Sequence, residues 1–145
     1  MTAQQKWEEY LSLEKIKDCG YEAWEFGASP DELALLVKRG IKTATSSAYD
    51  LYAKDSEPLP KAGEYSILSS KGEAVCIIKT VKVEVLRYCD VTEDFAFKEG
   101  EGDRTLAYWR CVHEDFFKKE LRAEGLEFSP EMKVVCEQFE LVFPK

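Results

Sequence analysis

Histidine and metal-binding cysteine motifs are scarce in this sequence. Its 145 residues include one histidine, His113, and five widely spaced cysteines with no Cys-x-x-Cys pair. Zinc sites need several such ligands close together, so the sequence argues against a zinc centre. Cys76 and Cys136 lie within apolar runs, where a thiol behaves as a small hydrophobic side chain. We therefore predict no metal centre, no cofactor, and free thiols in a reducing compartment.

Long apolar runs are also missing. No stretch approaches the roughly 18 apolar residues of a membrane span, and the first twenty residues carry charges every few positions, unlike a secretory signal. The sequence thus predicts a soluble, cytoplasmic protein without membrane contact. The formal net charge of -8 opposes sequence-independent binding of nucleic acid, because phosphate affinity requires clustered lysine and arginine. Any contact with nucleic acid must therefore be local.

Helix signals occur at four places, separated by loops and strand-like runs. Thr2 with Gln5 can form a capping box, and Ser29 followed by Pro30 is a typical helix start. Asp90 and Asp103 are the candidate caps of two later helices. These signals predict helices over about 3–19, 30–39, 91–97 and 104–122.

Strand-like runs are short and lie mostly in the middle and at the end of the chain. They are rich in β-branched residues, and the turn signal Ser-Ser-Lys-Gly joins two of them as a hairpin. Several short strands mixed with helices, without a repeat or a linker, indicate one α+β domain built on a small barrel. The predicted strands are 41–47, 64–68, 73–80, 81–86 and 133–143.

The segment Gly-Ile-Lys-Thr-Ala-Thr-Ser-Ser places Lys42 among hydroxyl side chains directly after a helix that ends at Gly40. It is either a polar edge strand or a site in which Lys42 holds a phosphate or an oxyanion while Thr45 binds or attacks the substrate. Positions three apart on a regular strand face opposite ways. We therefore predict that Lys42 precedes the strand, so that it can converge with Thr45.

A second unusual segment, Glu99-Gly100-Glu101-Gly102-Asp103, places three carboxylates between glycines. Neighbouring carboxylates repel one another and need compensation from water, from Lys42 or Arg104, or from Mg²⁺ or Ca²⁺. The spacing is not that of an EF-hand. The glycines allow the backbone to approach a ligand or to turn sharply.

Two aromatic features have both a structural and a functional interpretation. Trp24 belongs to the core or stacks on a base. His113 lies between Trp109 and Phe116 on the apolar stripe of a predicted helix, which is typical of a hydrogen-bonded, partly buried histidine rather than of a catalytic base.

Four segments carry a family resemblance: GIKTATSS, PxxGEYSIL, EGEGDRTLAYWRCVHEDFF and the closing VVCEQFELVF. In this order they resemble the ASCH family, especially its longer bacterial members, over nearly the whole chain. The resemblance implies an α+β fold, a small PUA-like mixed β-barrel with flanking helices. It implies a single domain over 1–145, with the helix at about 3–19 as an extension, and a cleft that takes RNA, a nucleoside or a nucleotide.

Some compact members of the family are amidohydrolases acting on N4-acetylcytidine, and others resemble ribonucleases. By motif their lysine, threonine and glutamate fall on Lys42, Thr45 and Glu99, with Glu101 as the competing glutamate. The N-terminal helix and the longer C-terminal half depart from those members, so the substrate does not transfer with the fold. The residues expected to bind substrate are Trp24, Thr43, Ser46, Ser47, Glu101, Arg104 and Arg110.

The resemblance leaves the chemistry open between an amidohydrolase, a ribonuclease and a non-catalytic RNA-binding module. A domain whose acidic loop binds a partner or a metal is a further alternative. In the hydrolase hypothesis Lys42 accepts the proton of Thr45 only if burial lowers the lysine pKa enough. Otherwise Lys42 is an ammonium that stabilises an oxyanion, and Glu99 is the better base.

Overall fold

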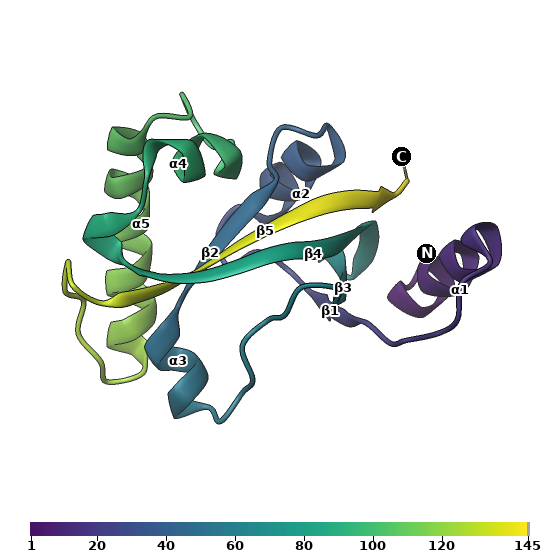
Figure 1. Ribbon diagram of the computed structural model, residues 1–145, viewed down its shortest axis with the longest axis horizontal. Coiled ribbons are helices and arrows are strands. Elements are labelled where there is room, and N and C mark those ends of the chain that lie inside the picture. Colours follow the sequence, from purple (N-terminus) through teal and green to yellow (C-terminus); the bar gives the residue numbers. More distant parts are fainter. Residues whose placement is uncertain (145) are drawn as a thin grey trace.

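The computed structural model describes residues 1–144, which form one α+β domain (Figure 1). Within this range five strands form one curled sheet in the order β1-β3-β4-β5-β2. Its pairs are antiparallel except for β1 with β3. The strands are β1 (Glu22–Trp24), β2 (Ala44–Ala48), β3 (Tyr65–Ser70), β4 (Glu73–Arg87) and β5 (Lys133–Phe143), and the helices are α1 (Ala3–Glu14), α2 (Pro30–Lys38), α3 (Tyr49–Lys54), α4 (Glu93–Glu99) and α5 (Leu106–Ala123), with a 3-10 turn at Tyr88–Asp90.

The long strands β4 and β5 pair side by side and form the spine of the sheet (Figure 1). The sequence predicted two strands, 73–80 and 81–86, where the structure has one. The ladder shifts register between Thr80 and Lys82, so Val81 is an extra residue in β4. Such a bulge bends a strand and increases its twist without ending it, which contributes to the curl of the sheet.

The hairpin between β3 and β4 confirms the predicted turn. Lys71 and Gly72 both have positive φ, 53° and 79°, as in the two-residue turns that match the twist of a hairpin. The strand predicted over 41–47 starts at Ala44 instead, so Lys42 precedes it as expected. Strand β1 and helix α3 were not predicted, because segments of three and six residues carry too little periodicity to be recognised from sequence.

The helix caps differ in part from the prediction. The capping box of Thr2 and Gln5 is present, but α1 ends at Glu14 rather than near residue 19, because Lys15 adopts a left-handed conformation with φ 54°. Ser29 makes no side-chain cap. The caps of α4 and α5 are the hydroxyls of Thr92 and Thr105 instead of Asp90 and Asp103.

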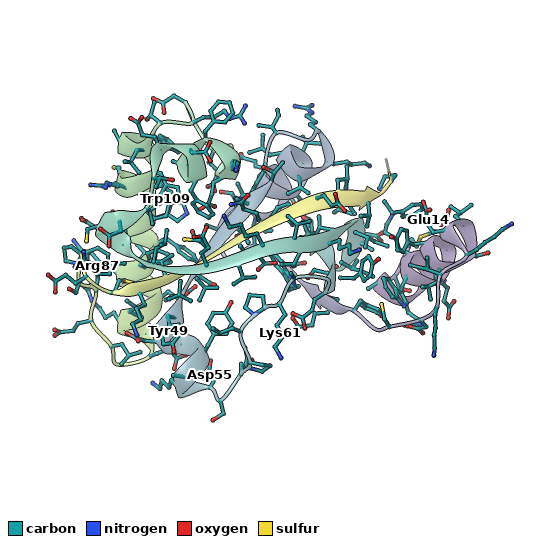
Figure 2. The ribbon with its side chains drawn as sticks, viewed as in Figure 1. Glu14, Tyr49, Asp55, Lys61, Arg87 and Trp109 are labelled. Carbon is teal, nitrogen blue, oxygen red and sulfur yellow. The ribbon has the colours of Figure 1, made fainter. Side chains whose placement is uncertain are left out.

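Helices α4 and α5 lie against one end of the sheet and α1 against the other (Figure 1). The largest core cluster packs Phe117 and Leu121 of α5 against Val134 of β5. Side chains fill the space between these layers (Figure 2). Cys76 and Cys136 are buried in the core as predicted, and burial raises the pKa of Cys76 to about 11 and that of Cys136 to about 12. No helix within residues 1–144 is long and apolar enough to cross a membrane.

Candidate functional site

A cleft of about 920 Å³ opens beside β2 and is lined by residues of the sheet, of α5 and of the loops around them. The most chemically distinctive residues in its wall are Lys42, Thr45, Glu99, Glu101, His113 and Glu137. Two segments far apart in the sequence, the one before β2 and the one after α4, meet at this wall. The cleft therefore joins the two motifs that the sequence singled out.

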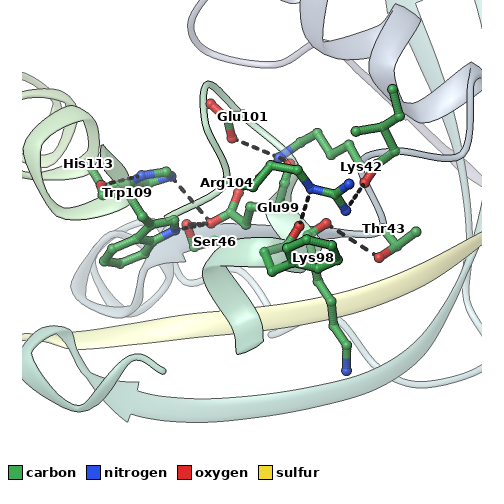
Figure 3. Close-up of polar contacts among 11 residues, drawn as sticks. Lys42, Thr43, Ser46, Lys98, Glu99, Glu101, Arg104, Trp109 and His113 are labelled. Atoms are coloured by element: carbon green, nitrogen blue, oxygen red, sulfur yellow. Dashed lines mark hydrogen bonds and ion pairs between the residues drawn. The ribbon is translucent and has the colours of Figure 1, made fainter. Parts of the chain in front are cut away.

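Lys42 lies at the mouth of β2 with 1% of its surface exposed. Its Nζ donates to Glu99 Oε1 at 2.9 Å, to Glu101 Oε2 at 2.9 Å and to the Glu99 carbonyl at 3.3 Å (Figure 3). The end of α2 fixes the backbone here, because the Lys42 amide donates to Leu36 O at 3.1 Å. Of the three compensations considered for the acidic segment, Lys42 is the one that the structure shows.

Glu99 is the last residue of α4 and is also 1% exposed. While Oε1 accepts from Lys42, Oε2 accepts from Ser46 Oγ at 2.6 Å and from Trp109 Nε1 at 2.6 Å. His113 Nε2 lies 3.3 Å from the same oxygen. Both carboxylate oxygens are thus occupied by donors, which offset the desolvation cost of the buried charge. Figure 3 shows Trp109 and His113 approaching Glu99 together from α5.

Lys42 remains an ammonium. Burial lowers its pKa, but the charges of Glu99 and Glu101 raise it by more, so the pKa lies above its ordinary value. The first version of the hydrolase hypothesis required burial to prevail and make Lys42 a neutral base. The structure favours the second version, in which Lys42 stabilises negative charge.

Glu99 favours the protonated form of His113. Burial lowers its pKa, and the Glu99 carboxylate raises it by more, to above the ordinary value. Its Nδ1 lies 2.9 Å from the Trp109 carbonyl, an acceptor, and Nε2 faces a carboxylate, so the doubly protonated ring satisfies both contacts. Burial raises the pKa of Glu99, but Lys42 and His113 lower it by more, and the carboxylate stays ionised.

Glu99, Glu101 and His113 also offer one ligand atom each within 4.8 Å of one another, as a metal site would require. The Lys42 ammonium, however, already bonds to both carboxylates at 2.9 Å. The Lys42 ammonium, together with His113 in its protonated form, therefore faces the same carboxylates that a metal ion would need.

Gly100 explains how α4 comes so close to the segment before β2. A Cβ at this position would lie 2.6 Å from the Ile41 carbonyl oxygen, and φ is +73°. Arg104 also links α4 to the segment before β2, because its guanidinium donates to the carbonyls of Phe97 at 3.0 Å and Ile41 at 3.3 Å. The glycine thus allows backbone to approach backbone, where the sequence analysis had considered a ligand or a turn.

We expect Gly100→Ala to lower the free energy of unfolding by about 2 kcal/mol or more, because it combines left-handed strain with a clash against Ile41. Urea denaturation measures the loss. Gly125→Ala is the matched control, since Gly125 also follows a helix at positive φ, +74°, but a Cβ there would meet nothing within 4 Å. Equal losses in the two variants would contradict the role assigned to the contact.

The structure brings most of the predicted site residues into the cleft and leaves three outside its wall. Thr43, Arg104 and Arg110 do not line it: Thr43 Oγ1 donates to Lys98 O, and Arg110 donates to the Cys89 carbonyl on the surface. Those that do line it are Trp24, Lys42, Thr45, Ser46, Ser47, Glu99 and Glu101.

Two of these residues serve the structure as well as the cleft. Trp24 packs edge-to-face against Phe26 in the core and also borders the cleft, so both interpretations of it apply. Ser46 faces Glu99, whereas Thr45, one position earlier on β2, faces the other way along the strand. Thr45 Oγ1 makes no hydrogen bond with any residue in 1–144.

The contribution of Trp109 and His113 to this centre was not predicted from the sequence. The prediction that His113 is buried and hydrogen-bonded is confirmed, and its ring stacks on Trp109 at 4.3 Å. The signal was the four-residue spacing, which places both rings on one face of α5. Their partner Glu99 lies before the helix and is reached only in the folded chain.

The family model of the ASCH domain matches residues 22–143. The chain belongs to the ASCH domain family. The ASCH domain from Lactobacillus crispatus JV V101 has a similar crystal structure, with 33% identity, 95% of this chain and 92% of that chain covered, and a TM-score of 0.88. A protein of family DUF984 from Enterococcus faecalis V583 is 38% identical, with 96% and 86% of the two chains covered and a TM-score of 0.89.

These likenesses confirm the predicted fold class, an α+β PUA-like domain, whose sheet is curled as a half-barrel. The ASCH fold is associated with RNA binding. No curated protein matches this chain.

Proposed function

We propose that this ASCH domain binds a modified nucleoside in the cleft and hydrolyses an amide of the N4-acylcytidine type. The observation that carries the proposal is the meeting of the buried Lys42–Glu99 pair with Thr45 in one cleft wall. Thr45 has a hydroxyl without a hydrogen-bond partner within residues 1–144, whereas the hydroxyls of its neighbours Ser46 and Ser47 are engaged. A free hydroxyl that lines the same cleft as a fixed ammonium is suited to attack a carbonyl bound between them.

In the proposed reaction Thr45 Oγ bonds to the amide carbonyl carbon, and its proton passes to a carboxylate. Lys42 stabilises the negative charge that develops on the carbonyl oxygen. The carbon–nitrogen bond then breaks as the carboxylate returns the proton to the leaving amine, which departs as cytidine. Water hydrolyses the acyl-threonine ester, releasing the carboxylic acid and restoring the hydroxyl.

We assign the proton transfers to Glu101 and the holding of Lys42 to Glu99. Both oxygens of Glu99 are occupied by Lys42, Ser46 and Trp109, so Glu99 has no free position for a proton in transit. Glu101 uses only Oε2, toward Lys42, and its side chain is 16% exposed against 2% for Glu99. The proposal therefore takes Glu101, the competing glutamate, as the base in place of Glu99.

We expect Thr45→Ala to lower kcat for N4-acetylcytidine hydrolysis by about 10³-fold or more, because the nucleophile is removed. Chromatographic detection of released cytidine measures the rate. Thr43→Ala is the matched control: it removes a hydroxyl two residues away that is bonded to Lys98 O and lies outside the cleft wall. Turnover retained in Thr45→Ala, with melting temperature unchanged, would contradict the nucleophilic role.

A surface feature favours non-catalytic RNA binding as a second candidate function. Phe97 is 53% exposed, and the Arg104 guanidinium lies 3.6 Å from its ring centroid. A stacked aromatic and guanidinium pair can add an unpaired base to the stack. Salt-sensitive binding of single-stranded RNA that is lost in Phe97→Ala, without any turnover in the wild type, would support this candidate against the hydrolase.

A further inference from the structure

The cleft contains a second buried carboxylate, Glu137 of β5, for which the proposed hydrolysis has no use. Glu137 is 8% exposed and lines the cleft. Its Oε2 accepts from Thr80 Oγ1 at 2.6 Å, and Oε1 has no hydrogen bond within residues 1–144. Glu137 is also the register partner of Thr45 across the β2–β5 ladder, so the two side chains are neighbours on one face of the sheet.

In the described part of the chain, no positively charged side chain pairs with this carboxylate. Within residues 1–144, Glu137 makes no ion pair, and the charges closest to it in effect are those of Glu22 and Glu64, which also line the cleft. Burial raises the pKa of Glu137, and these two carboxylates raise it further against the effect of the Thr80 hydroxyl. Lys42, which balances Glu99 and Glu101, is engaged elsewhere. A buried carboxylate in this setting is costly unless a ligand pairs with it.

We infer that the Glu137 end of the cleft, formed with Thr80, Glu22, Glu64 and Tyr52, is a binding subsite for an organic cation, an ammonium or guanidinium group carried by a ligand. The free Oε1 of Glu137 accepts the N–H of the bound cation, and Glu22 and Glu64 supply the surrounding negative potential. Tyr52, which lines the same end and whose hydroxyl is bonded to Ser47 Oγ at 2.7 Å, adds an aromatic side chain to the wall. The subsite does not depend on any amide hydrolysis in the cleft.

An elongated cation fits this end better than a metal ion. Within residues 1–144 the group of metal-ligating side chains whose atoms converge within 4.8 Å is the one at Glu99, and Glu137 is not part of it. The carboxylates around Glu137 are therefore spread over the wall instead of converging on one point. A metal ion requires converging oxygens, whereas an ammonium or guanidinium group is bound by one carboxylate in a negative surrounding.

Calorimetric titration with agmatine, which carries both an ammonium and a guanidinium group, tests the subsite. We expect saturable binding to the wild type and no binding of succinate, a dianion of similar length. Glu137→Gln is expected to weaken agmatine binding at least about tenfold, because the amide keeps an acceptor for Thr80 but loses the charge. Its melting temperature should be unchanged or higher, since a buried unpaired charge is removed.

Glu140→Gln is the matched control, because Glu140 lies three residues further along β5 and is exposed. It should leave agmatine binding unchanged. Absence of agmatine binding to the wild type, or equal affinity in Glu137→Gln, would overturn the inference. Displacement of agmatine by an equimolar amount of Mg²⁺, but not by NaCl of the same ionic strength, would overturn it in favour of a metal site. None of these outcomes bears on the Thr45 experiment, so the two proposals fail separately.

Discussion

Replacing Lys42 with methionine is expected to lower the free energy of unfolding by about 3–5 kcal/mol. Methionine fills most of the volume of the lysine stem but leaves two carboxylates facing each other in a buried site. Glu99 has 2% of its side chain exposed and cannot reach water to compensate. The expected loss is the destabilisation caused by leaving a buried charge unpaired, which is larger than the stabilisation that the salt bridge itself contributes.

Urea denaturation at neutral pH measures this loss. Lys119→Met is the matched control, since Lys119 pairs with Asp115 at 3.0 Å but has 75% of its side chain exposed, and exposed pairs contribute little. The double variant Lys42→Met with Glu99→Gln should recover part of the stability, because the unpaired charge of the Glu99 carboxylate is removed as well. A loss in Lys42→Met no larger than that in the control would contradict the buried ion pair.

Replacing Glu99 with glutamine is expected to remove much of the dependence of stability on pH. The folded pKa of Glu99 is below its ordinary value of 4.5. The contribution of Glu99 to the free energy of unfolding is therefore complete above about pH 4.5 and is lost as pH falls through the lower folded value. The folded pKa of His113 is above its ordinary value of 6.5. The contribution of His113 to the free energy of unfolding is therefore complete below about pH 6.5 and is lost as pH rises through the higher folded value. Both contributions are complete between these values.

The difference in unfolding free energy between wild type and Glu99→Gln should therefore be largest between about pH 4.5 and 6.5 and decrease on either side. Taking the difference cancels other titrating groups such as Glu137, whose raised pKa works in the opposite direction to that of Glu99. We expect the glutamine variant to lose about 3 kcal/mol or more at the maximum, because an amide cannot pair with both Lys42 and His113. A difference that does not vary with pH would contradict the coupling of these charges.

Local sequence signals were sufficient for the long elements of the fold. Apolar residues at helical spacing predicted α1, α2 and α5, and β-branched runs predicted β3 and β5. Helix ends were less reliable, because Asp90 and Asp103 resemble caps as well as Thr92 and Thr105 do. Only the backbone geometry at each end decides which side chain reaches the first amides. The continuity of β4 through its bulge likewise depends on its partner β5 and not on its own residues.

The sequence determined which residue types this protein has for chemistry: a lysine and hydroxyls after a helix, glycine-spaced carboxylates, and one histidine on an apolar face. The position of Lys42 before β2 also followed from the two-residue period of a strand. Only the tertiary structure decided which charges pair, because the contacts of Glu99 with Lys42 and Ser46 join segments more than fifty residues apart. It also left Glu137 without a cationic partner among residues 1–144, since pairing depends on which side chains the curled sheet turns into the cleft, and no local pattern encodes that direction.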